Sequence, residues 1–216
     1  MIWLYTGTPG SGKSLHVAKD VYYKLLKKDW VFANFEINVD YFLHKRKKEM
    51  PGTFILRPNW KLSAMWFMNF AQEFFSRDAK GRIKEGQALI VIDECQLMFN
   101  SRDWQAADRG EWTSFFTQHR KYGYNIILIT QFDRLIDRQM RSLVEYEVKH
   151  RKLNNFKIIG KIVGLLMGGN AFMAISYWYG AKERISSEMF AGKKYYEFYD
   201  SYKIFSVKEK SKAVKG

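Results

Sequence analysis

The chain has 216 residues, 47% of them hydrophobic, a length that suits one α/β domain with a sizeable core, alone or with a small appendage. Its net charge is +14, with 23 Lys and Arg against 17 Asp and Glu in residues 1–150 and 13 against 5 in residues 151–216. A basic surface is typical of proteins that bind nucleic acid or an anionic membrane; a solvated cationic face is the alternative, which charge alone does not exclude. A single cysteine, Cys95, excludes an internal disulfide, and no secretory leader precedes the first predicted strand, so we expect a cytoplasmic location.

The first predicted elements form a strand, a glycine-rich loop and a helix. A buried strand from Ile2 to Tyr5 and a helix from Ser14 to Leu26 flank a segment of the form G-x-x-x-x-G-K-[ST], the P-loop. In this motif, backbone N–H groups and the helix N-terminus surround phosphate oxygens. The alternative is a glycine-rich turn between a strand and a helix with a chance Lys-Ser pair. It does not explain why the motif occurs between the strand and the helix that a P-loop requires. We therefore predict a nucleotide site at Gly7, Thr8, Pro9, Gly10, Ser11, Gly12, Lys13, Ser14 and Leu15.

Two residues of the loop have expected chemical roles. Lys13 is predicted to reach the β- and γ-phosphates of the nucleotide, and the Ser14 hydroxyl to hold Mg²⁺. ATP and Mg²⁺ are therefore the expected cofactors.

The middle of the chain continues the alternation of strands and helices. Strands are predicted from Trp30 to Glu36 and from Thr53 to Arg57, and a helix from Trp60 to Ser76. The helix carries an aromatic stripe whose spacing is typical of a core face rather than of a ligand site.

The segment Ala88 to Glu94 reads as a buried strand that ends in two acids. In open α/β sheets ligands bind at the carboxyl edge of the strands. We therefore predict that Asp93 binds Mg²⁺, together with Ser14, and that Glu94 is the general base for the attacking water. An acidic helix cap after a strand is the alternative.

The next elements complete the predicted core. A helix is expected from Glu111 to Lys121, and strands from Asn125 to Gln131 and from Leu143 to His150. Thr130 and Gln131 are candidates for contact with the γ-phosphate or the attacking water, unless the strand simply ends in polar residues. The alternation predicts a mainly parallel sheet with helices on both faces, a P-loop NTPase core over residues 1–150.

The remaining sequence differs from this core. The stretch from Ile162 to Tyr179 carries no charge, so its length touches the threshold for a membrane span, but Gly168-Gly169-Asn170 lies at its centre. This turn signal favours a β-hairpin over a span. We predict a β-rich extension over residues 151–206, including a strand-like "KKYYEFYDSYKIFS", and a disordered basic tail over residues 207–216.

Accessory motifs narrow the class of P-loop protein. The [NT]KxD motif of GTPases and the LSGGQ motif of transporter cassettes do not occur in the sequence. The adjacent Asp93 and Glu94 favour an ATPase with its own catalytic glutamate. That class has an extra strand between the P-loop strand and the acidic strand, which Thr53 to Arg57 or the next strand would supply.

Five segments resemble the zonula occludens toxin-like family, the filamentous-phage assembly ATPases. They are "IWLYTGTPGSGKS", "VIDECQLMFNSR", "HRKYGYNIILITQ", "IDRQMRSLVEYE" and "FYDSYKIF", and they extend over nearly the whole chain. The resemblance implies a RecA-like ATPase domain on the cytoplasmic face of the host inner membrane. It also implies a transmembrane segment after that domain and a periplasmic part beyond it.

The resemblance also carries residue roles. Family positions match Arg102, His119, Arg120, Thr130, Gln131 and Arg141. P-loop motors commonly place an arginine near the γ-phosphate, often from a neighbouring subunit. Arg102, Arg120 and Arg141 are the candidates, with a salt bridge or a solvated arginine as the alternative for each.

The function that the resemblance implies is a motor of phage assembly and extrusion. ATP hydrolysis in a ring, by family analogy a hexamer, would drive exchange of packaging protein for coat protein on single-stranded DNA at the inner membrane. The alternative is a hexameric DNA translocase that acts directly on nucleic acid. A secreted toxin has no support in these residues.

Overall fold

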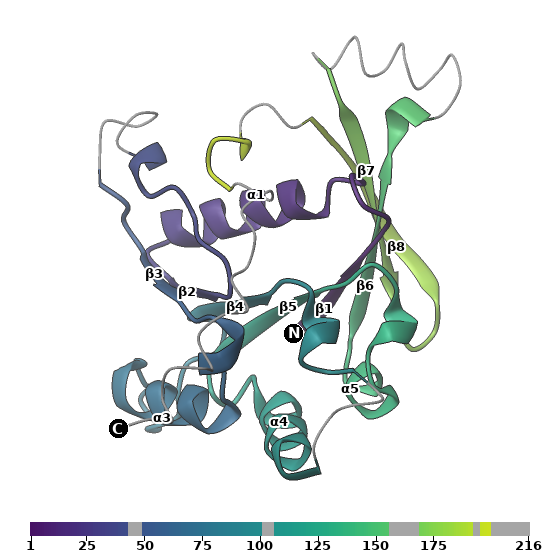
Figure 1. Cartoon of the computed structure of the whole chain (residues 1–216). Helices are drawn as coiled ribbons and strands as arrows, with labels where there is room; N and C mark the ends of the chain where they lie inside the picture. The colour runs from purple at the N-terminus through teal and green to yellow at the C-terminus, as the bar shows by residue number, and fades with distance from the viewer. Residues whose placement is uncertain (43–48, 101–105, 156–168, 192–194, 200–216) are drawn as a thin grey trace, which may run out of the picture.

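The computed structural model describes residues 1–42, 49–100, 106–155, 169–191 and 195–199. These residues build an eight-stranded sheet with α1 on one face and α3, α4 and α5 toward the other (Figure 1). The predicted α/β class, with helices on both faces, is confirmed.

The elements follow the predicted alternation along the chain. The strands are β1 (Ile2–Thr6), β2 (Trp30–Ala33), β3 (Thr53–Leu56), β4 (Ala88–Ile92), β5 (Tyr124–Ile129), β6 (Tyr146–Lys152), β7 (Ala171–Trp178) and β8 (Glu183–Ala191). The α-helices are α1 (Lys13–Leu26), α3 (Ala64–Phe74), α4 (Ala106–Gln118) and α5 (Arg138–Ser142).

The strand order in the sheet is β3-β2-β4-β5-β1-β6-β7-β8. The first six strands in this order, β3, β2, β4, β5, β1 and β6, are parallel to one another. Strand β7 pairs antiparallel with β6 on one side and with β8 on the other. An extra strand does separate the P-loop strand β1 from the acidic strand β4. It is β5, not the segment from Thr53 to Arg57, which forms the edge strand β3.

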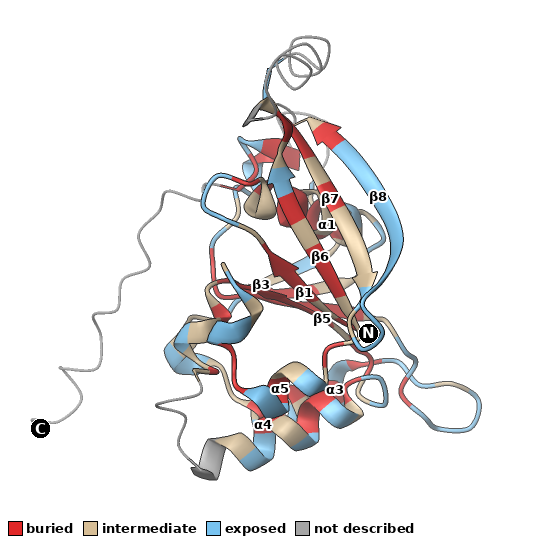
Figure 2. Ribbon diagram, turned by 90° about the vertical axis from the view of Figure 1, so that its right-hand side faces the viewer, coloured by how far each residue is buried: buried red, intermediate tan, exposed pale blue. Residues whose placement is uncertain are grey.

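Each face of the parallel sheet has its own core. Side chains alternate along β1, so Ile2 and Leu4 pack with Phe67 of α3 and Phe115 of α4, while Tyr5 packs with α1 on the other face. All five residues of β4 are buried, as expected for a central strand covered on both sides. Figure 2 shows this burial along the inner strands, with exposed residues along the outer strand β8.

The helix predicted from Trp60 begins four residues later. Ser63 is its N-cap, and the Ser63 hydroxyl accepts a hydrogen bond from the Trp66 N–H at 3.3 Å. Asn59–Lys61 form a separate 3-10 turn after Pro58. The aromatic periodicity identified the helix, and the cap set its start. The predicted strands likewise end earlier, at Ala33 rather than Glu36, and at Ile129 rather than Gln131.

The predicted hairpin turn at Gly168-Gly169-Asn170 lies partly outside the described residues, as does the whole of the arm before it. The turn that joins β7 to β8 covers residues 179–182, where Lys182 has a left-handed φ of 58° and its N–H donates to Trp178 O at 2.8 Å. Asn170 directly precedes β7, so the uncharged stretch is not one helical span. None of the helices in the described ranges is long and apolar enough to cross a membrane.

The late aromatic segment also departs from the prediction. Residues 195–199 form a short turn instead of a strand. The other residues of "KKYYEFYDSYKIFS" lie outside the described residues, and so does the predicted tail over residues 207–216.

Candidate nucleotide-binding site

The P-loop lies between the carboxyl end of β1 and the first turn of α1. Gly10 and Gly12 have left-handed φ angles of 72° and 96°, which side chains rarely adopt. A Cβ on Gly12 would lie 2.6 Å from the Phe172 ring, so the loop passes directly beneath β7. A Cβ on Gly10 would meet no described atom within 4 Å. The loop therefore presents bare backbone on its open side.

Lys13 folds over this loop. Its Nζ donates to Gly7 O at 2.5 Å and to Thr8 O at 3.2 Å. Burial lowers the pKa of Lys13, and the charges of Asp93 and Glu94 oppose that shift. The ammonium group is thus already oriented at the phosphate cradle, within the field of the two acids predicted to act there.

Asp93 is fixed at the end of β4 by a reciprocal pair of hydrogen bonds. The Asn34 amide donates to Asp93 O at 2.8 Å and accepts from the Asp93 N–H at 2.8 Å. The side chain accepts at Oδ1 from the Glu94 N–H and at Oδ2 from the Tyr199 hydroxyl, both at 2.8 Å. Burial raises the pKa of Asp93, and these two donors act against that rise.

Glu94 has an unusual backbone conformation. Its φ of 48° lies in the left-handed region, which is uncommon outside glycine and is often retained at functional positions. The residue caps the turn Cys95–Leu97, and Gln96 Nε2 donates to Glu94 Oε2. This sharp turn directs the chain away after β4 and leaves the carboxylate at the sheet edge.

One cavity of about 590 Å³ brings together most of the predicted nucleotide-site residues, while Gly7 and Thr8 line the neighbouring cavity. The first cavity is lined by the loop from Pro9 to Leu15 and by Asp93, Glu94 and Gln131. Gln131 is also tied to the loop, since its carbonyl accepts from the Gly7 N–H at 3.3 Å. The cavity further includes residues that sequence reasoning missed: Lys152, Asn170, Phe172, Tyr196 and Tyr199.

The residues present fit a bound phosphate. In the described part of the chain, Ser11 Oγ is buried without a hydrogen-bond partner inside the loop. The first turn of α1 contains no acidic residue, and the leading N–H groups of a helix lack intrahelical acceptors. An anion at this point would satisfy these donors and interact favourably with the helix dipole.

The same cavity fits Mg²⁺ as a companion of phosphate. Among the described residues no group of three or more His, Cys, Asp or Glu side chains could hold a metal alone. Mg²⁺ is commonly bound by one or two protein oxygens together with substrate phosphates and water. Ser14 and Asp93, which share the cavity, offer such oxygens.

Comparison with known proteins places the chain in a family. The family model described as "Zonular occludens toxin (Zot)" matches residues 1–191. The chain belongs to the Zot family. A curated relative, the Gene 1 protein of Enterobacteria phage I2-2, is 27% identical over 95% of this chain. The Zot-family chain spans 57% of the length of that relative.

Solved structures agree with the P-loop NTPase fold. The N-terminal domain of zonular occludens toxin from Neisseria meningitidis is 21% identical, with a TM-score of 0.52, covering 92% of this chain and 98% of that domain. B204, the DNA-packaging ATPase from Sulfolobus turreted icosahedral virus, is 16% identical, with a TM-score of 0.51 and coverage of 88% and 96%. Identities this low establish the fold alone.

The three arginines that the Zot resemblance indicated lie in different places. Arg120 pairs with Glu145, which also accepts from the Ile2 N–H at 3.1 Å, so Arg120 lies at the amino end of β1, opposite the P-loop. Arg141 Nη1 donates to Asp133 O at 3.4 Å, beside the loop that carries Gln131. Arg102 lies outside the described residues. The structure therefore does not bring Arg120 to the P-loop of its own chain.

His119 and Thr130 also matched family positions. His119 Nδ1 lies 2.6 Å from Phe116 O and its Nε2 lies 2.7 Å from the Met1 amino group, at the amino edge with Arg120. The Thr130 N–H donates to Tyr5 O at 3.0 Å, at the carboxyl edge beside the P-loop strand. The two positions therefore belong to opposite ends of the sheet.

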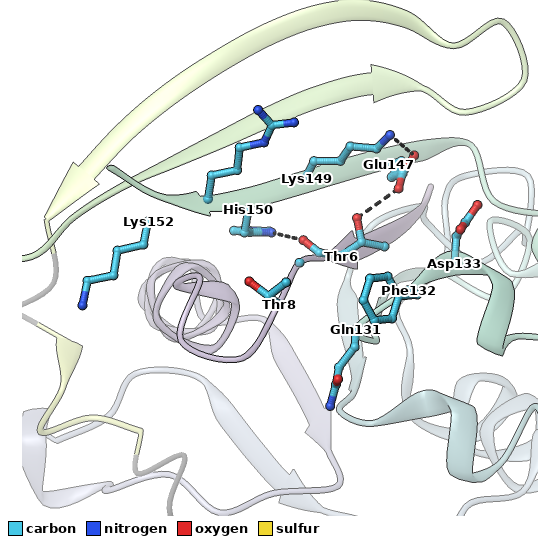
Figure 3. A pocket seen from close by; sticks show the side chains of 11 residues that line it. Thr6, Thr8, Gln131, Phe132, Asp133, Glu147, Lys149, His150 and Lys152 are labelled. Carbon is cyan, nitrogen blue, oxygen red and sulfur yellow. Dashed lines mark hydrogen bonds and ion pairs between the residues drawn. The ribbon is translucent and has the colours of Figure 1, made fainter. Parts of the chain in front are cut away.

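A second cavity, of about 450 Å³, adjoins the first and shares Gln131 and Lys152 with it. Figure 3 shows Glu147 on β6 between two neighbours: it accepts from the Thr6 hydroxyl at 3.0 Å and lies 3.5 Å from Lys149 Nζ. The Glu147 side chain is only 4% exposed. This network connects β6 to the end of β1, from which the P-loop starts.

A histidine pair connects α1 to β6 beneath the P-loop. His16 Nδ1 lies 2.8 Å from His150 Nε2, and His150 Nδ1 lies 3.2 Å from Thr6 O. Burial lowers the pKa of His150 to about 3 and also lowers that of His16. Both rings are therefore neutral near pH 7. Their hydrogen bond fixes the position of α1 relative to β6.

Proposed function

We propose that this chain is the ATPase domain of a filamentous-phage assembly motor that works at the cytoplasmic face of the host inner membrane. The observation that carries the ATPase proposal is the single cavity that contains Lys13, Ser14, Asp93 and Glu94. Membership of the Zot family and the likeness to phage Gene 1 proteins support the assembly role. Phage coat and packaging proteins are the proposed partners.

Each residue of the cavity has a proposed task. Lys13 would pair with the β- and γ-phosphates of ATP, and Ser14 and Asp93 would hold Mg²⁺. The metal would neutralise charge that develops on the phosphate oxygens. Glu94 would accept the proton of the attacking water, and Gln131, hydrogen-bonded to Gly7 at the loop, would orient that water.

Replacing Lys13 with Ala tests nucleotide binding. A charge-assisted hydrogen bond is worth about 1.5–3 kcal/mol, so we expect ATP affinity to fall about 10- to 150-fold. Titration with a fluorescent ATP analogue measures the loss. Lys27→Ala is the matched control, because Lys27 is exposed at the far end of the same helix. Unchanged ATP affinity in a folded Lys13→Ala protein would refute the proposed site.

A second candidate function is a DNA translocase. Three basic residues, Lys149, Arg151 and Lys152, line the second cavity next to the P-loop. A protein that tracks DNA should hydrolyse ATP faster with single-stranded DNA, and the DNA effect should weaken steeply with salt. A hydrolysis rate that DNA leaves unchanged would favour the assembly motor instead.

A further inference from the structure

The turn at residues 195–199 packs against α1 and against the segment that follows β2. Tyr195 packs against Tyr22 of α1 with ring centroids 5.6 Å apart, and Phe198 is fully buried. The Asn38 N–H, in the segment after β2, donates to Phe198 O at 2.9 Å. The turn is therefore held by both apolar packing and backbone hydrogen bonding.

This docking brings Tyr199 to Asp93. The Tyr199 ring packs on Phe35 with centroids 4.3 Å apart, and its hydroxyl donates to Asp93 Oδ2 at 2.8 Å. Both groups are buried, with 6% and 8% of their surfaces exposed. A residue 106 positions later in the chain thus reaches the acid predicted to bind Mg²⁺.

We propose that Tyr199 is a positioning residue for Asp93, and that through it the turn at residues 195–199 is coupled to binding of the Mg²⁺–nucleotide complex. This inference rests on the proposed function, because it takes Asp93 as a ligand to Mg²⁺ or to its water. It adds a residue, and a segment of the chain, that the P-loop and the acidic strand do not supply.

The carboxylate geometry allows this role. An ionised carboxylate has about four lone-pair sites, and the Glu94 N–H and the Tyr199 hydroxyl occupy one on each oxygen. The other sites stay available to a metal or its water. Two donors fix the rotation of the carboxylate, and partners of this kind are typically worth 10- to 100-fold in metal affinity.

The coupling must act in both directions. If the docked turn improves binding of the Mg²⁺–nucleotide complex, then that complex must stabilise the docked turn by the same factor. Backbone amides report this docking. The Asn38 N–H bonds to Phe198 O, and the Phe198 N–H bonds to Tyr195 O at 3.1 Å. Their hydrogen exchange should slow when Mg²⁺ and ATP bind.

The decisive variant is Tyr199→Phe, which keeps the ring on Phe35 and removes only the hydroxyl. Binding of a fluorescent ATP analogue is titrated with Mg²⁺, and once in EDTA. We expect the Mg²⁺ concentration for half-maximal enhancement to rise about 10- to 100-fold, with unchanged affinity in EDTA. Tyr195→Phe is the control, because its hydroxyl, in the same turn, bonds to Tyr23 rather than Asp93.

The outcomes separate the inference from the proposed function. A wild-type chain that binds no nucleotide refutes the proposed function itself. Wild-type binding with an identical Mg²⁺ dependence in Tyr199→Phe overturns the inference alone. An equal loss of affinity with and without Mg²⁺ also overturns it, because the hydroxyl would then serve only the fold. Slower exchange at Asn38 and Phe198 in the wild type, reduced in Tyr199→Phe, would support it.

Discussion

Replacing Glu94 with Gln is expected to slow ATP turnover about 10²- to 10⁴-fold while ATP binding stays intact. Gln keeps the shape of the side chain and its place beside Gln96, but it cannot accept a proton from water. The lost rate should appear in kcat rather than in the affinity for ATP. Steady-state phosphate release and analogue titration measure the two quantities separately.

The control for this variant is Glu73→Gln, an exposed residue of α3 in which the same atoms change. Its turnover should equal that of the wild type. A Glu94→Gln protein that hydrolyses ATP at the wild-type rate would remove Glu94 from the mechanism. The base would then have to be sought among the other residues that line the cavity.

The sequence predicted the P-loop and the acidic strand because both depend on short patterns. A strand, a glycine loop and a helix follow one another within residues 2–26, and the acids directly follow the buried strand β4. Parallel strands bring their carboxyl ends to one edge, so Lys13, Asp93 and Gln131 meet without any long-range information beyond the fold class.

The residues that sequence reasoning missed depend on distant contacts. Asn34 clamps Asp93 across neighbouring strands, and Tyr199 reaches Asp93 from a turn whose sequence looked like a strand. Asn34 could have been identified from the sequence, because it is a polar residue at the carboxyl end of a predicted strand. For Tyr199 only the docking of the turn onto α1 reveals the contact, and periodicity carries no information about it.

The β7–β8 hairpin has a turn that no local signal indicated. Gly168-Gly169-Asn170 is a strong turn sequence that precedes β7, whereas this hairpin reverses at residues 179–182. Pairing with β6 extends β7 as far as Trp178, opposite Tyr146, and the Tyr179 N–H then donates to Glu145 O at 2.9 Å. The ladder with a long neighbouring strand fixed where the chain reverses.

The order of the elements separates the arginine candidates. A match to a family position does not by itself tell at which end of a strand a residue lies, but the helix predicted before the strand at Asn125 already indicated the amino edge for Arg120. Arg120 follows α4 and precedes β5, which puts it at the amino edge with Glu145. We therefore expect Arg120→Ala to change kcat little, and we retain Arg102 and Arg141 as candidates for an arginine shared between subunits.

The largest expected effect concerns Arg141. If neighbouring chains form a ring, proposed to be a hexamer, Arg141 of one chain would approach the γ-phosphate in the next. An arginine of this kind is worth about 10³- to 10⁵-fold in kcat, so Arg141→Ala should lose activity by that order while it still binds ATP. Turnover per chain should rise with protein concentration in the wild type, and this rise should vanish in the variant.

Mixing two inactive proteins tests the shared site most directly. Arg141→Ala supplies an intact P-loop and Lys13→Ala supplies an intact arginine, so one kind of interface between them is complete and part of the activity should return. Arg138→Ala, on the exposed side of the same short helix, is the control and should stay active alone. If the mixture stays inactive while Arg102→Ala restores activity with Lys13→Ala, the arginine is Arg102. Fast turnover that is independent of concentration in a proven monomer contradicts a shared site, because every catalytic group must then come from one chain.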